Sequence, residues 1–151
     1  MEITEVTQLL DKIAKDPGFI EKKKKSLPVE QEEYLAAYLF YEKGHYKEAS
    51  AAFAKLIMIN GLEKKYWTGL AASEQQGKNY QNALPAWAMA AILDPANPAP
   101  HFHAAECLIS QNEIKEAMLA LEEAKRRSPE KELLDKIDAL KEIWQPTKGA
   151  K

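Results

Sequence analysis

The residues best suited to chemistry lie in a short stretch just after residue 100: His101, His103, Glu106 and Cys107. On a helix, His103, Glu106 and Cys107 would share one face, because their spacing is i, i+3 and i+4. Imidazole, carboxylate and thiolate groups are metal ligands, and a thiol beside an imidazole can act as a nucleophile. However, Cys107 follows two alanines in a predicted helix, where a cysteine packs as a small apolar residue. We therefore expect a structural role for this cluster, with no metal site and no catalytic residue.

No other pattern in the sequence indicates catalysis. The six glycines are scattered, and they form neither a Gly-x-Gly cluster nor a phosphate-binding Gly-Lys-Ser/Thr loop. A Gly-x-Ser-x-Gly nucleophile motif is also missing. The sequence therefore predicts a protein that is not an enzyme and uses no cofactor.

The composition is that of one globular domain, with 151 residues of which 46% are apolar and 29% charged. The 21 basic and 23 acidic residues give a net charge of −2, so no broad basic surface for nucleic acid is expected. The single charge run, Lys22–Lys25, is typical of a solvated helix face or linker, and a binding role for it stays open.

Several features predict a cytoplasmic protein. The only cysteine, Cys107, excludes an intramolecular disulfide. The start of the chain, Met1–Glu5, is acidic and polar, which does not resemble a signal peptide. The longest apolar run, Ala86–Leu93, is far too short to cross a bilayer, so no stable membrane insertion is expected.

The elements that position these residues follow from an internal repeat. Ala49, Ala83 and Ala117 are spaced by 34 residues, and other columns keep the same period. These columns are Ala37/Ala71/Ala105, Tyr46/Tyr80/Ile114, Phe53/Trp87/Leu121, Leu56/Ala90/Ala124 and Gly61/Pro95/Pro129. Small residues let two helices approach closely, large residues fill the space to the next helix, and Gly or Pro ends each unit. The pattern predicts stacked helix hairpins that share one continuous core.

The expected all-α architecture has an N-terminal helical segment at 1–28, with an amphipathic helix at about 3–15. Three repeats follow at about 29–61, 62–95 and 96–129, so the repeat region is 29–128. Their helices are expected at about 29–43, 46–59, 62–76, 80–93, 98–110 and 114–126. Ser128 is a predicted N-cap for a capping helix at 129–144, and a mobile tail at 145–151 ends the chain.

A face rich in tyrosine is predicted on the first helix of the first repeat. Tyr34, Tyr38 and Tyr41 lie at i, i+4 and i+7, whereas the repeat alignment assigns Ala37 and Phe40 to the core. We expect the tyrosines to line the concave side of the superhelix and to bind a partner, because tyrosine offers a large, rigid surface with a polar handle. Alternatively, they cover the N-terminal segment. The matching positions in the later repeats are Thr68, Ala72, Gln75, Phe102, Glu106 and Ile109.

The 34-residue spacing resembles the tetratricopeptide repeat, a helix-turn-helix unit, over about residues 30–129. The turn motif is Gly44-x-Tyr46 in the first copy, whereas the second has Gly77 one position early and the third has Asn112. The stretch from Pro100 to Leu108 (PHFHAAECL) is similar to the third repeat of the LcrH/SycD-like class II chaperones of bacterial type III secretion. The first repeat is also similar, from Tyr38 to Phe53.

This resemblance implies a cytoplasmic, ATP-independent chaperone that keeps secreted translocator proteins soluble and competent for export. Its concave groove would bind an extended Pro-x-Leu-x-x-Pro segment, and Tyr34, Tyr38, Tyr41 and Tyr46 match the groove tyrosines of the family. Phe102 and its neighbours would extend the groove. The N-terminal segment would mediate a homodimer.

Three alternatives stay open. The chain could serve another exported protein, such as a gatekeeper, or act as a generic tetratricopeptide adaptor that binds a terminal carboxylate. Lys65 is then the single candidate cation, so a basic clamp is not expected. An enzyme using His103 and Cys107 would reveal itself by rapid alkylation of the thiol at neutral pH.

Overall fold

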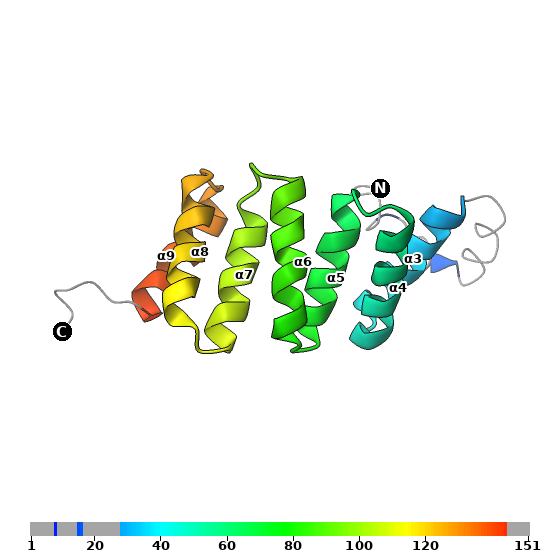
Figure 1. The fold of residues 1–151 in the computed structure, drawn as a ribbon, viewed down its shortest axis with the longest axis horizontal. Helices are drawn as coiled ribbons and strands as arrows, with labels where there is room; N and C mark the ends of the chain where they lie inside the picture. Colours follow the sequence, from blue (N-terminus) through cyan, green and yellow to red (C-terminus); the bar gives the residue numbers. More distant parts are fainter. Residues whose placement is uncertain (1–7, 9–14, 17–27, 145–151) are drawn as a thin grey trace.

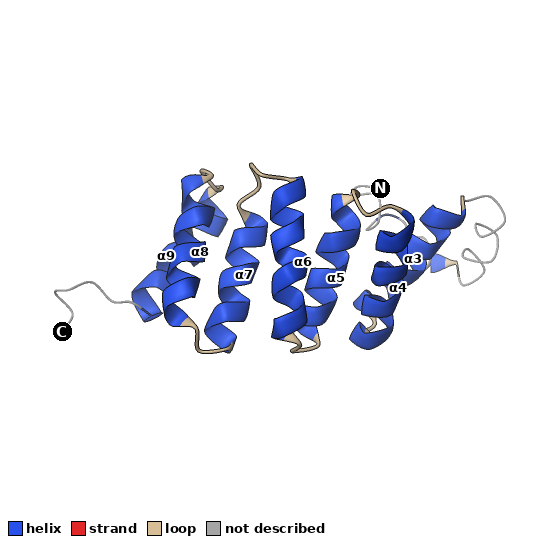
Figure 2. Ribbon diagram, viewed as in Figure 1, coloured by secondary structure: helices blue, strands red, loops and turns tan. Residues whose placement is uncertain are grey.

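The computed structural model describes residues 8, 15, 16 and 28–144. In that part of the chain the ordered elements are all helices: α3 (Val29–Glu42), α4 (Tyr46–Ile59), α5 (Lys64–Gln76), α6 (Tyr80–Leu93), α7 (Ala99–Ser110), α8 (Ile114–Arg126) and α9 (Lys131–Trp144). Figure 1 shows them in one row that follows the chain, and each helix packs against the next. Short loops join them, and no strand occurs among the residues drawn in colour (Figure 2). The predicted all-α repeat fold is confirmed.

The expected N-terminal segment and tail cannot be compared with the structure. The predicted helix at 3–15 lies outside the described residues, apart from residues 8 and 15. The lysine run at 22–25 and the tail at 145–151 are also outside them.

Alanines of the 34-residue columns form the centre of each helix pair. Ala37 and Ala49, Ala71 and Ala83, and Ala105 and Ala117 are all fully buried. Each pair belongs to its own core cluster, which also contains the large residue of the repeat alignment: Phe53, Trp87 or Leu121. The small side chains therefore lie where paired helices approach, and the large ones fill the space beside them, as the repeat alignment predicts.

The turn inside each hairpin has the same geometry in all three copies. Gly44, Lys78 and Asn112 have φ of 79°, 63° and 63°, which is the left-handed region. In each copy, the amide of the following residue donates to the carbonyl five residues back, with N···O distances of 2.8 Å. This bond is the helix-ending pattern that glycine favours. The turn therefore tolerates Lys78 and Asn112 in place of the missing glycine.

Two expectations about individual residues are wrong. The repeat alignment assigns Phe40 to the core, yet this residue is 37% exposed and stacks on His45 beside the turn. The core of α3 instead contains Tyr34, because this side chain reaches Phe53 and the next repeat. Ser128 does not cap the last helix, because it has φ of 51° and belongs to the turn after α8, so α9 begins at Lys131.

Candidate functional site

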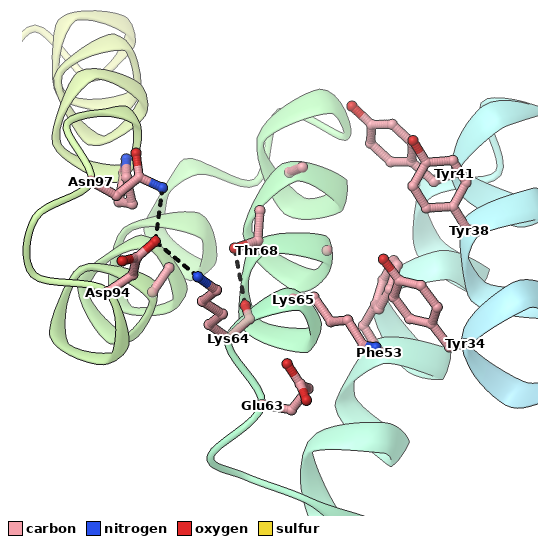
Figure 3. Close-up of a pocket in the computed structure, with 14 residues that line it drawn as sticks. Tyr34, Tyr38, Tyr41, Phe53, Glu63, Lys64, Lys65, Thr68, Asp94 and Asn97 are labelled. Carbon is pink, nitrogen blue, oxygen red and sulfur yellow. Dashed lines mark hydrogen bonds and ion pairs between the residues drawn. The ribbon is translucent and has the colours of Figure 1, made fainter. Parts of the chain in front are cut away.

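A cavity of about 640 Å³ lies between the first helices of the first two repeats (Figure 3). Its aromatic wall comes from α3 and α4, and its other walls come from α5, the end of α6 and the start of α7. It is lined by Tyr34, Tyr38, Tyr41, Phe53, Glu63, Lys64, Lys65, Thr68, Gly69, Ala72, Ala90, Asp94, Asn97 and Pro100. The structure thus brings together five of the predicted groove residues: Tyr34, Tyr38, Tyr41, Thr68 and Ala72.

The tyrosines of α3 form a continuous row of rings. The centroid distance is 6.3 Å from Tyr34 to Tyr38 and 6.2 Å from Tyr38 to Tyr41. Tyr41 continues the row to Tyr46 at 5.7 Å, with the two rings edge to face. Burial raises the pKa of both Tyr38 and Tyr41, so both hydroxyls stay protonated at neutral pH. The wall is therefore an uncharged aromatic surface with hydroxyl groups that can hydrogen-bond.

The three cavity tyrosines differ in burial. Tyr34 is only 5% exposed, with its ring 6.0 Å from Phe53 and 5.6 Å from Tyr66. Lys65 Nζ lies 5.0 Å from the Tyr34 ring, close enough for a cation–π contact. Tyr38 and Tyr41 are only half-buried and are packed against the same core cluster. Tyr34 is therefore a core residue at the base of the wall, while Tyr38 and Tyr41 offer accessible surface.

Small residues on α5 leave room for the cavity. Thr68 occupies the repeat position that holds Tyr34 in the first copy and Phe102 in the third. Gly69 follows it and has no side chain, so the Phe53 ring approaches its α-carbon directly. An aromatic side chain at residue 68 would project into the space that the cavity now occupies. Because the second repeat has threonine at this position instead of an aromatic residue, the space of the cavity stays open there.

The opposite side of the cavity is polar and is closed by an ion pair. Lys64 Nζ lies 3.2 Å from Asp94 Oδ2, which also accepts a hydrogen bond from Asn97 Nδ2 at 3.1 Å (Figure 3). Lys64 is therefore paired, and Lys65 lies over the Tyr34 ring. Both lysines of the cavity lining therefore have a contact inside the protein, one with a carboxylate and one with an aromatic ring.

The remaining predicted groove residues lie away from the cavity. Gln75 and Glu106 hydrogen-bond to each other between α5 and α7, at 3.1 Å. Phe102 is 5% exposed and belongs to the core around α8 and α9, with Ile109 packed against the same cluster. Tyr46 borders a second hollow between α4 and the end of α5. Phe102 is therefore buried among core residues instead of presenting its ring to a partner.

The residues that the sequence analysis considered for chemistry, His101, His103, Glu106 and Cys107, do not form one site in the structure. Cys107 is fully buried in the core with Trp87, and burial raises the pKa of its thiol to about 12. His103 Nδ1 lies 2.7 Å from Glu106 Oε1 instead. Among the described residues, no group of three or more His, Cys, Asp or Glu is arranged to hold a metal ion. A buried thiol that holds its proton at neutral pH favours the structural interpretation over a nucleophile.

His101 points to a different interface, between α7 and α8. Its Nε2 atom is buried and has no hydrogen-bond partner in the described structure. Burial and the nearby Arg127 guanidinium lower the pKa of His101, while Glu123 opposes them. The neutral imidazole therefore belongs to the packing of the third repeat.

Sequence reasoning missed part of the cavity lining. Glu63 immediately precedes α5 and Lys64 is its first residue, whereas Asp94 and Asn97 belong to the loop after α6. Sequence reasoning did not single them out, because Lys64 and Asp94 lie at opposite ends of the second repeat and meet only when α5 packs on α6, where Asn97 joins them from the start of the third. In the described residues, no helix is long and apolar enough to span a membrane.

Comparisons with known proteins agree with this geometry. The tetratricopeptide repeat family matches residues 75–137. The low calcium response locus protein H of Yersinia pestis is 31% identical over 113 residues, which cover 72% of this chain and 67% of that protein. The Yersinia enterocolitica type III secretion chaperone SycD, solved with a peptide of the translocator YopD, aligns with a TM-score of 0.72. The identity is 28%, and the alignment covers 76% of this chain and 91% of SycD.

A second SycD structure, described as an alternative dimer, aligns with a TM-score of 0.73 and 29% identity. It covers 80% of this chain and 94% of SycD. The repeat fold, the aromatic cavity and these relatives define a helical-repeat chaperone. The chain belongs to the LcrH/SycD-like family of type III secretion chaperones.

Proposed function

We propose that the protein is a bacterial cytoplasmic chaperone that binds an extended apolar segment of a secreted translocator-type protein. Binding keeps the partner soluble and ready for export. The observation that carries this proposal is the cavity of about 640 Å³ walled by Tyr38 and Tyr41. Its similarity to SycD, solved with a translocator peptide, supports the choice of partner.

The shape and chemistry of the cavity suit an extended peptide. Half-buried tyrosines provide apolar surface with few rotatable bonds, so they lose little entropy when a partner binds. The stacked helices are preformed and do not need to fold around the partner. Covering an apolar segment of a partner prevents its aggregation, and this requires neither hydrolysis nor a cofactor. A non-enzymatic binding role therefore accounts for the site.

A homodimer is part of the proposal, because SycD has been described as a dimer. Sedimentation equilibrium of the full chain, alone and with a bound partner, tests whether it forms this homodimer. A monomer at all concentrations would contradict it.

The experiment compares the wild-type chain with a Tyr38→Ala/Tyr41→Ala double variant as baits for proteins in a lysate of the native bacterium. The matched control is Ile92→Ala/Leu119→Ala, which removes two exposed apolar side chains from α6 and α8. We expect exported, apolar-rich proteins to bind the wild-type chain and the control but not the double variant. Partners that persist with the double variant and disappear with the control would contradict the proposed site.

The alternative function is that of a chaperone for a different exported protein, such as a gatekeeper, which would bind in the same cavity. The identities of the captured proteins distinguish a translocator chaperone from a gatekeeper chaperone. Capture of proteins that are not exported would instead support a generic adaptor.

A further inference from the structure

A hydrogen-bonded chain of side chains holds Glu106 in one orientation. Trp87 Nε1 donates to Gln75 Oε1 at 2.9 Å, and Gln75 Nε2 donates to Glu106 Oε1 at 3.1 Å. His103 Nδ1 lies 2.7 Å from the same oxygen. Among the described residues, Glu106 Oε2 has no hydrogen-bond partner. The carboxylate is therefore fixed through one oxygen, and the other remains available to a donor.

Glu106 occupies the same repeat position as two residues that line the tyrosine cavity. In the 34-residue register it corresponds to Tyr38 in the first repeat and to Ala72 in the second, and both of these line the cavity. Gln75 corresponds in the same way to Tyr41, another cavity residue. Glu106 thus lies one repeat further along the same face, and 37% of its side chain is exposed.

The charge of Glu106 is only weakly compensated. Burial opposes ionisation, but the hydrogen bonds of His103 and Gln75 lower the pKa of the carboxyl below its usual value. Lys136 on α9 also favours the charged form, yet its own ion pair is with Glu132, at 3.7 Å. The carboxylate is therefore ionised at neutral pH without a lysine or arginine partner in the described structure.

We propose that Glu106 determines specificity by binding a Lys or Arg side chain of the same segment whose apolar residues occupy the cavity. The inference rests on the proposed function. A backbone amide of the segment could also donate, but amides recur at every residue, and charge-assisted bonds are about twice as strong as neutral ones. One cationic anchor beside one apolar anchor fixes both the register and the direction of the segment.

The helix spacing predicts where the cation lies. Packed helices are about 8–10 Å apart, and an extended chain advances about 3.3 Å per residue. One to two helix spacings separate the cavity from Glu106, so the cation is expected about three to six residues from the apolar anchor.

The probe is a phage-displayed library of random 12-residue peptides, selected on the immobilised full chain. Four baits are used: wild type, Glu106→Gln, Tyr38→Ala and the control Glu116→Gln. Glu116 lies exposed on α8, so its substitution changes the net charge equally without touching this surface. We expect wild type and Glu116→Gln to select apolar residues with a Lys or Arg at the fixed spacing. Glu106→Gln should select the apolar residues without the basic one.

A titration then compares one selected peptide with its analogue, in which norleucine replaces the basic residue. Wild type should prefer the basic peptide by about five- to tenfold at low salt, and the preference should fall as salt is added. Glu106→Gln should bind both peptides equally, with an unchanged affinity for the norleucine form. Glu106→Lys should prefer a glutamate analogue.

Different results contradict the specificity proposed for Glu106 and the proposed chaperone function. Selection by wild type without any basic preference, or a preference that survives in Glu106→Gln, overturns the role of Glu106. The first of these outcomes needs only the wild-type chain, so it stays decisive if the variant does not fold. If wild type selects no peptide, or if Tyr38→Ala binds the selected peptides as tightly, the proposed function itself is wrong.

Discussion

The indole ring of Trp87 stacks on the imidazole of His103, with centroids 4.7 Å apart and an interplanar angle of 25°. Trp87 belongs to the second helix of one repeat and His103 to the first helix of the next. Sixteen residues separate them.

The same separation of 16 positions recurs between the first two repeats and between the third repeat and α9. Phe53 packs on the α-carbon of Gly69, and Leu121 and Ile137 are fully buried in one cluster. The partner differs in size from pair to pair: glycine for Phe53, an imidazole for Trp87 and isoleucine in the cluster of Leu121. Phe53 and Gly69 also line the cavity, so their contact sets how closely α4 and α5 approach there.

Gly69→Ala should destabilise the protein. A Cβ atom at residue 69 would lie 2.3 Å from the Phe53 ring, which is 1% exposed and has little freedom to move. Alanine favours a helix over glycine by about 1 kcal/mol, but overpacking costs about 1–3 kcal/mol. We expect a net loss, measured by urea unfolding. Phe53→Leu in the same chain should recover part of it, because the smaller side chain relieves the overlap. Unchanged or increased stability of Gly69→Ala would contradict this packing.

Tyr34→Ala and Tyr38→Ala should behave differently, although both tyrosines line the cavity. Tyr34 is a core residue, so its truncation should reduce the free energy of unfolding by about 3 kcal/mol or more. Tyr38 is half-buried, so its truncation should weaken peptide binding by about 1–3 kcal/mol with a much smaller loss of stability. Thermal unfolding and peptide titration of both variants test this difference. Equal losses of stability would show that Tyr38 is also part of the core.

Lys78→Gly should stabilise the second hairpin. Lys78 has φ of 63°, and a residue with a Cβ atom is strained there. Glycine removes this strain but makes the unfolded chain more flexible, so we expect a gain of about 0.5–1 kcal/mol. Asn112→Gly should gain less, because asparagine tolerates this conformation, and Gly44→Lys should lose stability. Melting temperatures that did not follow this order would show that the three turns are not equivalent.

Cys107 should react slowly with iodoacetamide at neutral pH and rapidly in urea. Burial raises the pKa of the thiol from 9.0 to about 12, so the folded chain holds its proton more tightly than the unfolded chain. The Cys107 contribution to stability is therefore constant below about pH 9 and declines as the pH rises toward 12. Urea unfolding of wild type and Cys107→Ala from pH 7 to pH 11 measures it. The advantage of wild type should shrink above pH 9, and rapid alkylation of the folded chain would revive the nucleophile hypothesis.

The sequence alone determined the helices and their pairing. A period of 34 residues, alanines where helices approach, and a turn residue between them are local signals, because each depends on residues within one hairpin. The same period is sufficient to place Tyr38, Ala72 and Glu106 on one face of the superhelix.

Only the tertiary structure decided which residues of that face are accessible. Tyr34 and Tyr38 are indistinguishable by type and spacing, yet Tyr34 is buried because Tyr66 of the next repeat packs on it. The Gln75–Glu106 hydrogen bond likewise joins residues of two successive repeats, 31 positions apart. Such contacts depend on how one repeat stacks on the next, and no signal within a single repeat encodes that geometry.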